Sequence, residues 1–146
     1  MKRYVLWSML AVAAIGLVLL PSVAAAAEDV PFTETYVLTA TEVHGNRTFL
    51  SGTGTGTVVG AFLRTGWVQI KRNQLVGAST ITAANGDSLY IESTQTWDRP
   101  TQSWSGPFTI VGGTGRFANA TGSGTTTNTP NPDGTTTGTR EGKISF

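Results

Sequence analysis

The sequence predicts an all-β domain, an eight-stranded antiparallel up-and-down barrel that follows an amino-terminal signal peptide. Helical periodicity is nearly absent, Thr and Gly are abundant after residue 27, and turn signals recur about every 8–12 residues. The chain also contains no Cys. Its core must therefore be held by backbone pairing and packing alone, and a sheet closed into a barrel leaves no unpaired edge.

The first 27 residues have the three parts of a signal peptide. Two basic residues precede a long apolar run, and the small residues Ala25 and Ala27 then fit the positions that signal peptidase reads. The alternative is an uncleaved membrane anchor, but Pro21 and the alanines weaken a span, and no positive cluster follows. We expect cleavage near Ala27 and a secreted, extracytoplasmic domain of residues 28–146.

The charge of this domain argues against polyanionic partners. Without Lys2 and Arg3, the remaining 119 residues carry 8 basic and 9 acidic side chains, a net charge of −1. Nucleic acid and anionic membrane surfaces bind basic patches, which this balance does not provide. The length is that of a single domain.

Turn residues divide the domain into eight expected strands. The strongest turn signal is Asn85-Gly86, since both residues tolerate the positive φ of a two-residue hairpin. Pro107 cannot donate to a ladder, so it predicts a bulge or a locally open edge. A single helical turn is expected at 116–120. The expected strands are 32–43, 48–62, 67–71, 75–83, 88–97, 104–111, 121–127 and 135–146.

Alternation indicates which residues share a face of the sheet. Leu89, Ile91 and Gln95 lie on one face of their strand, and Tyr90 and Glu92 lie on the other. Six alternate positions from 52 to 62 hold four glycines on one face, which predicts either a strongly coiled strand or room for something large. An eight-stranded barrel can hold one small ligand where small residues leave space.

The segment 109–124 reads Thr-Ile-Val-Gly-Gly-Thr-Gly-Arg-Phe-Ala-Asn-Ala-Thr-Gly-Ser-Gly. It resembles the hallmark of the allene oxide cyclase and dirigent-like barrel superfamily, in which a Gly-Gly-Thr-Gly-x-Phe turn precedes the next strand. The stretches 52–57 and 81–89 and the carboxyl-terminal Gly-x-Ile-x-Phe resemble exported bacterial members. Together these similarities span most of the domain.

This resemblance implies a calycin-like barrel with an apolar central cavity, often assembled as a homo-oligomer such as a dimer or trimer. It implies that any chemistry needs no cofactor, because the cavity orients a reactive substrate with one or two polar groups. We interpret the motif as structural. Gly112, Gly113 and Gly115 would permit a turn that other residues strain, Phe117 would anchor it on the barrel, and Arg116 would lie at the surface.

Two carboxylates lie in the middle of expected strands and are the candidate catalytic residues. Glu34 shares a face with Tyr36, and Glu92 shares a face with Tyr90. A carboxylate that faces the lumen would have a raised pKa and could move protons in a cyclisation. The alternative is that both face water, as half of the residues of a barrel strand do.

The aromatic residues could stack on a flat ligand, although aromatic residues at alternating positions also form cores and interfaces. The candidate ligand-binding residues are Tyr36, Tyr90, Trp97, Trp104 and Phe108.

The sequence favours no metal site, hydrolytic triad or phosphate loop. His44 is the single histidine and lies in an expected turn, with no Cys to accompany it. No nucleophile elbow is present, and no Gly-Lys-Ser/Thr follows the Gly-rich segments. We therefore expect no cofactor and no metal.

Two functional hypotheses follow. The first is a secreted barrel that encloses a small apolar molecule, either as a binding protein or as a cofactor-free cyclase or isomerase. An enclosed apolar pocket with Glu34 or Glu92 pointing inward would favour catalysis. The second is a non-catalytic structural or interaction protein that uses the outer surface of the barrel.

Overall fold

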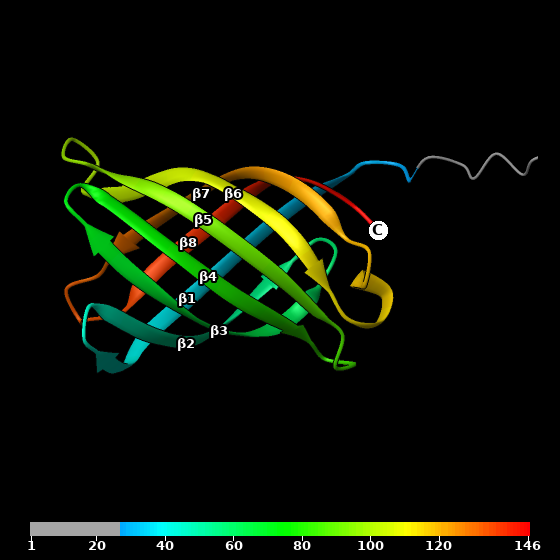
Figure 1. The fold of residues 1–146 in the computed structure, drawn as a ribbon, viewed down its shortest axis with the longest axis horizontal. Helices are drawn as coiled ribbons and strands as arrows, with labels where there is room; N and C mark the ends of the chain where they lie inside the picture. The colour runs from blue at the N-terminus through cyan, green and yellow to red at the C-terminus, as the bar shows by residue number, and fades with distance from the viewer. Residues whose placement is uncertain (1–26) are drawn as a thin grey trace, which may run out of the picture.

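The computed structural model describes residues 27–146. All of the predicted signal peptide except its last residue, Ala27, therefore lies outside the described residues. Each strand pairs antiparallel with the next, and the last pairs with the first, which closes the barrel (Figure 1). The predicted eight-stranded up-and-down barrel is therefore confirmed. The strands are β1 (Val30–His44), β2 (Arg47–Gly56), β3 (Gly60–Lys71), β4 (Gln74–Ala83), β5 (Ser88–Asp98), β6 (Ser103–Gly113), β7 (Thr121–Pro130) and β8 (Thr136–Ser145).

The prediction was wrong about where the second and third strands meet. The chain turns at 57–59, and Gly60, directly after the turn, has a φ of +74°. The turn expected at 64–66 is instead the middle of β3, where Arg64 pairs with Gly52 on one side and Ile81 on the other. The turn residues Thr57, Val58 and Val59 are all β-branched, a residue type typical of strands, so the composition did not mark this hairpin. The number of strands stayed correct because the missed turn and the false turn compensate each other.

Two irregularities lie in the ladder between β5 and β6, and the sequence predicted the first of them, at Pro107. Paired residues stop at Ser93–Phe108 and resume at Thr96–Ser105, which places the interruption opposite Pro107. The register also shifts after Tyr90, where β6 contributes an additional residue. Such irregularities bend the strand and increase its twist, which helps a small sheet to close.

The Gly-rich motif forms the turn between β6 and β7, as interpreted from the sequence. Gly112 and Gly115 have φ values of +141° and +58°, which L side chains rarely adopt. A Cβ on Gly113 would lie 2.1 Å from the Ser88 carbonyl oxygen, so only glycine fits beside β5. The helical turn is shorter than expected and covers Gly115–Phe117 (η1). The Phe117 side chain is fully buried.

The barrel interior is filled by side chains at one end and is hollow at the other. Inward-facing apolar residues pack at the end where β1 begins and β8 finishes, and Phe117 covers this end. The apolar residues in this packed end include Phe32, Phe62, Ile81, Leu89, Ile110 and Ile144.

The glycines of β2 and β8 make room for the protein's own side chains. A Cβ on Gly54 would lie 2.4 Å from the Phe62 ring, and one on Gly138 would lie 2.0 Å from the Tyr36 ring. The room predicted beside the glycines of 52–62 is therefore filled by the Phe62 ring at Gly54 and by β1 at Gly52 and Gly56. Within residues 27–146, η1 is the sole helical segment, so no helix there has the length and apolar character needed to span a bilayer.

Two phenylalanines allow a measurement of how much the buried Phe117 side chain of η1 contributes to stability. Phe117 is fully buried, whereas Phe146, whose ring lies 5.3 Å away, is 48% exposed. We expect Phe117→Ala to lower the free energy of unfolding by about 3–5 kcal/mol, because it opens a cavity at the packed end. Phe146→Ala should cost about 1 kcal/mol or less. Urea unfolding of both variants tests this, and equal losses would show that the motif does not anchor the turn.

Candidate functional site

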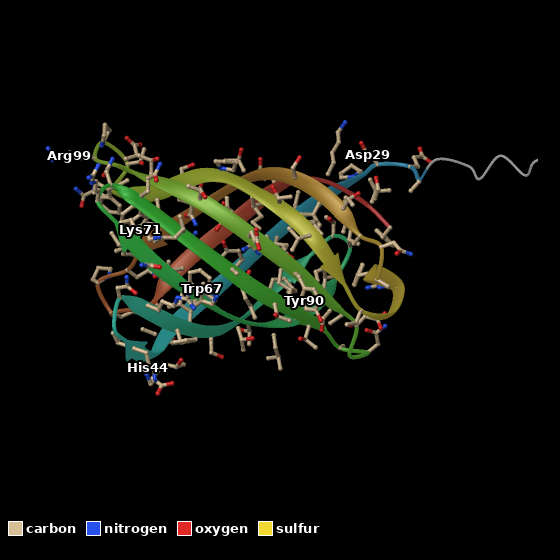
Figure 2. The ribbon with its side chains drawn as sticks, in the orientation of Figure 1. Asp29, His44, Trp67, Lys71, Tyr90 and Arg99 are labelled. Carbon is tan, nitrogen blue, oxygen red and sulfur yellow. The ribbon has the colours of Figure 1, made fainter. Side chains whose placement is uncertain are left out.

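The hollow end of the barrel contains the candidate site, a cavity of about 120 Å³. Its lining residues come from the end of the barrel where β4, β6 and β8 begin and where β7 finishes. Lys71 and Arg99 mark this end in Figure 2, and Asp29 marks the opposite one. The cavity is thus bounded by strand ends and hairpins at its rim and by the middle of the barrel at its floor.

The walls of the cavity are apolar and its floor is polar. Side chains from four strands form the apolar part, namely Leu38, Leu50, Leu75 and Trp104. Polar side chains that also contact the cavity are Arg64, Ser79, Ser93, Gln95 and Asn128. Such a combination of apolar surface with a few convergent polar groups is typical of small-molecule sites.

A buried ion pair lies in the middle of the barrel, next to this floor. Glu34 and Arg140 are directly opposite each other where β1 pairs with β8. Arg140 donates from Nη1 to Glu34 Oε2 over 3.0 Å and from Nη2 to Ser79 Oγ over 3.2 Å. Both side chains are almost fully buried. Burial, the largest influence, raises the pKa of Glu34 although Arg140 opposes that rise.

A second arginine lies in the lumen, and it stacks on a tyrosine. The Arg64 guanidinium lies 4.1 Å from the centre of the Tyr36 ring, and that of Arg140 lies 5.3 Å from it. Burial, and then the charge of Arg140, lower the pKa of Arg64 to about 10. Burial alone would raise the pKa of Tyr36, but the two arginines outweigh it and lower that pKa.

The Tyr36 hydroxyl begins a chain of hydrogen bonds that reaches the cavity. It donates to Asn128 Oδ1 over 3.0 Å and also lies 3.1 Å from Thr126 Oγ1. Asn128 Nδ2 donates to Gln95 Oε1 over 2.7 Å, and Gln95 Nε2 donates to Ser93 Oγ over 3.3 Å. These bonds fix the orientation of both amides at the cavity floor.

The two carboxylates predicted as catalysts lie on opposite sides of the barrel wall. Glu34 faces the lumen, but it is paired with Arg140 and is not part of the cavity lining. Glu92 faces outward and lines shallow grooves on the outer surface beside Trp67. The structure therefore does not bring them together.

The predicted ligand-binding aromatic residues are divided in the same way. Trp104 lines the cavity, and its ring lies 5.2 Å from that of Trp97. Tyr36 lies beneath the cavity floor, and Phe108 belongs to the core, where its ring lies 5.8 Å from that of Phe32. Tyr90 is 40% exposed on the outer face. Trp104 is thus the member of this set in direct contact with the cavity.

Sequence reasoning missed the polar residues of the lumen. Arg64 was assigned to a turn, although one correct boundary at Gly60 would have placed it on the same face as Phe62. Arg140 alternates with Gly138, Gly142 and Ile144, a spacing that puts a charged residue on an inward face. Gln95 was correctly placed on the face of Leu89 and Ile91, but its role was not recognised.

Metal-binding groups are not gathered in the described part of the chain. In residues 27–146 no three His, Cys, Asp or Glu side chains form a cluster that could hold an ion. His44 is exposed at the end of β1 and contacts Glu42.

The Glu34–Arg140 pair can be tested by a double-mutant cycle. Arg140→Met should lower the free energy of unfolding by about 3–5 kcal/mol, because it leaves the Glu34 carboxylate buried without its partner. Adding Glu34→Leu should recover most of that loss, since the apolar pair carries no desolvation cost. Chemical denaturation measures both steps. A double variant as unstable as Arg140→Met alone would mean that the cost comes from packing and not from charge.

Comparison with known proteins supports the fold. No protein-family model and no curated protein matches the chain. Among solved structures, it is similar to one described as the pterocarpan synthase dirigent protein GePTS1, with a TM-score of 0.54 and 15% sequence identity. The match covers 83% of this chain and 88% of that one. The expected resemblance is thus confirmed for the architecture: this chain has the eight-stranded antiparallel barrel fold of a dirigent protein.

Proposed function

We propose that this protein is a secreted, cofactor-free barrel that binds a small, largely apolar molecule in the cavity at the Leu75–Trp104 end. The observation that carries the proposal is the cavity itself, in which leucine and tryptophan walls surround a fixed polar floor. A solved structure of the same fold is described as a pterocarpan synthase dirigent protein, which supports a role with a small molecule.

The size of the cavity limits the part of the ligand that it encloses. Its volume is about 120 Å³, whereas an apolar engineered cavity of about 150 Å³ binds benzene. The enclosed part is therefore about the size of one aromatic ring or a short branched chain. A longer molecule would extend past Pro130 and Thr136, which lie at the rim.

Binding is better supported than cyclase or isomerase chemistry. Glu34 is the buried carboxylate among the described residues, and it is held by Arg140 instead of facing the cavity. A general base needs to reach the proton that it removes. The cyclase hypothesis would need the Glu34–Arg140 pair to open, whereas binding uses the floor as it stands.

The outer surface supports a second candidate, an interaction role. A shallow groove of about 570 Å³ crosses β1–β6 and is lined in part by Phe49, Trp67, Tyr90 and Val111. Trp67 and Tyr90 lie on the side of the barrel facing the reader in Figure 2. Exposed aromatic surface of this kind often marks a contact site.

A pair of adjacent substitutions distinguishes the inside of the barrel from the outside. Thr136 lines the cavity, whereas Thr137, its neighbour in β8, is exposed on the outer face. We expect toluene to shift the Trp104 indole N–H resonance in ¹⁵N-labelled protein. Thr136→Phe should weaken this binding by at least about tenfold, because its ring occupies the rim. Thr137→Phe should leave it unchanged.

The same titration contains the result that would overturn the proposal. If toluene shifts no resonance of a cavity residue, or if both variants bind it as the unmodified protein does, the cavity is not a binding site.

A further inference from the structure

We propose that the cavity binds its ligand as a carboxylate anion, with the Arg64 guanidinium as the cationic partner. This inference rests on the proposed binding function and deepens it by naming the class of ligand, a small organic acid with an apolar body. It follows from three features of the lumen: its charge, the unused hydrogen-bonding groups of its floor, and the depth at which Arg64 lies.

The lumen contains more positive than negative charge. Its buried ionisable side chains in the described residues, Tyr36 aside, are Glu34, Arg64 and Arg140. Glu34 Oε2 is paired with Arg140 over 3.0 Å, while Glu34 Oε1 has no hydrogen-bond partner, so one carboxylate faces two guanidinium groups and the lumen keeps a net positive charge. Arg64 remains as a guanidinium that is 7% exposed. A buried charge without a partner is costly, and an anion that binds there would offset the cost.

Arg64 is held in place but is not satisfied. The Tyr36 ring supports one face of the guanidinium at 4.1 Å. Its Nη1 atom is buried and has no hydrogen-bond partner. A planar guanidinium that is oriented by stacking and retains free N–H groups suits a carboxylate, because the two can form paired, charge-assisted hydrogen bonds.

The amides of the floor also offer donors. Asn128 Oδ1 accepts from Tyr36, and Gln95 Oε1 accepts from Asn128, so both amide oxygens are engaged. Each amide nitrogen makes one hydrogen bond and keeps a second N–H. The free groups at the floor are therefore mainly donors. A carboxylate, which only accepts, complements such a floor better than a neutral molecule that also carries donors.

The position of Arg64 sets the direction in which the ligand enters. Among the cavity-lining residues of β3, Arg64 is the farthest from the β3–β4 hairpin at the rim. Among those of β4, Ser79 is the farthest from it. Leu75, Pro130 and Thr136 lie near strand ends at the rim. An acid would thus enter with its carboxylate first, and its apolar body would lie against Leu38, Leu50 and Trp104.

The test compares benzoate with benzamide, two ring compounds of nearly the same shape that differ in charge. Dissociation constants are measured at pH 7 by following the Trp104 indole resonance. We expect benzoate to bind the unmodified protein at least about tenfold more tightly than benzamide. In Arg64→Met this preference should disappear, while benzamide binding changes little. Arg64→Lys should keep a preference for the acid, because it keeps the charge.

Arg99→Met is the matched control. Arg99 is exposed at the same end of the barrel (Figure 2), so this variant loses one positive charge near the rim without changing the floor. It should keep the full preference for benzoate. If Arg99→Met and Arg64→Met reduce the preference equally, long-range attraction explains it and the Arg64 site is rejected.

The remaining outcomes separate the two proposals. If toluene and benzamide bind but benzoate binds no more tightly than benzamide, the cavity is a binding site and the carboxylate inference fails. If none of the three compounds binds, both proposals fail. If Arg64→Met does not fold, Arg64→Lys decides in its place. A preference for benzoate that is smaller in Arg64→Lys than in the unmodified protein and in Arg99→Met supports a paired guanidinium contact, and a preference equal to that of the unmodified protein rejects it.

Discussion

The pairing of β1 with β8 closes the barrel, and the organisation of the lumen depends on that closure. Without Cys, nothing covalent holds the first strand to the last. Nine residue pairs from Val30–Ile144 to Leu38–Thr136 form this seam. Glu34 and Arg140 are opposite each other within it, so a slip of β8 by one residue along β1 would turn Arg140 to the outer face and leave the Glu34 carboxylate in the lumen without it. The ion pair therefore belongs to one register alone.

Closure also explains why the lumen is full at one end and hollow at the other. Eight strands leave an interior just wide enough for side chains to fill. Where glycine faces an aromatic ring, as Gly54 faces Phe62 and Gly138 faces Tyr36, the ring occupies the space that a Cβ would need. Nearer the rim, Gly66 and Gly77 have no such ring beside them and contact the cavity instead. Small residues thus produce packing or a cavity according to what lies opposite.

The fold was far more predictable from the sequence than the site. Turn spacing and alternation are local signals, and they predicted eight strands and placed Gln95 on the same face as Leu89 and Ile91. The site depends on which inward residues of different strands meet, and this is set by register across the closed sheet. Glu34 and Arg140 are 106 residues apart. The hairpin between β2 and β3 shows the same limit. The sequence placed it at 64–66 and the structure places it at 57–59, and this difference moves Arg64 from a surface turn to the lumen.

The two lumen arginines connect stability with binding. Arg140 is neutralised by Glu34, whereas Arg64 depends on the face of Tyr36, which compensates a guanidinium only in part. Tyr36 in turn orients Asn128, and Asn128 orients Gln95. Removing the Tyr36 side chain would therefore disturb both the Arg64 guanidinium and the amide donors of the cavity floor. A ligand that neutralises Arg64 would bind the folded barrel and not the unfolded chain, so the incompletely satisfied lumen becomes more stable when it is occupied. Under the proposed function, the cavity floor is the part of the core that a bound carboxylate would complete.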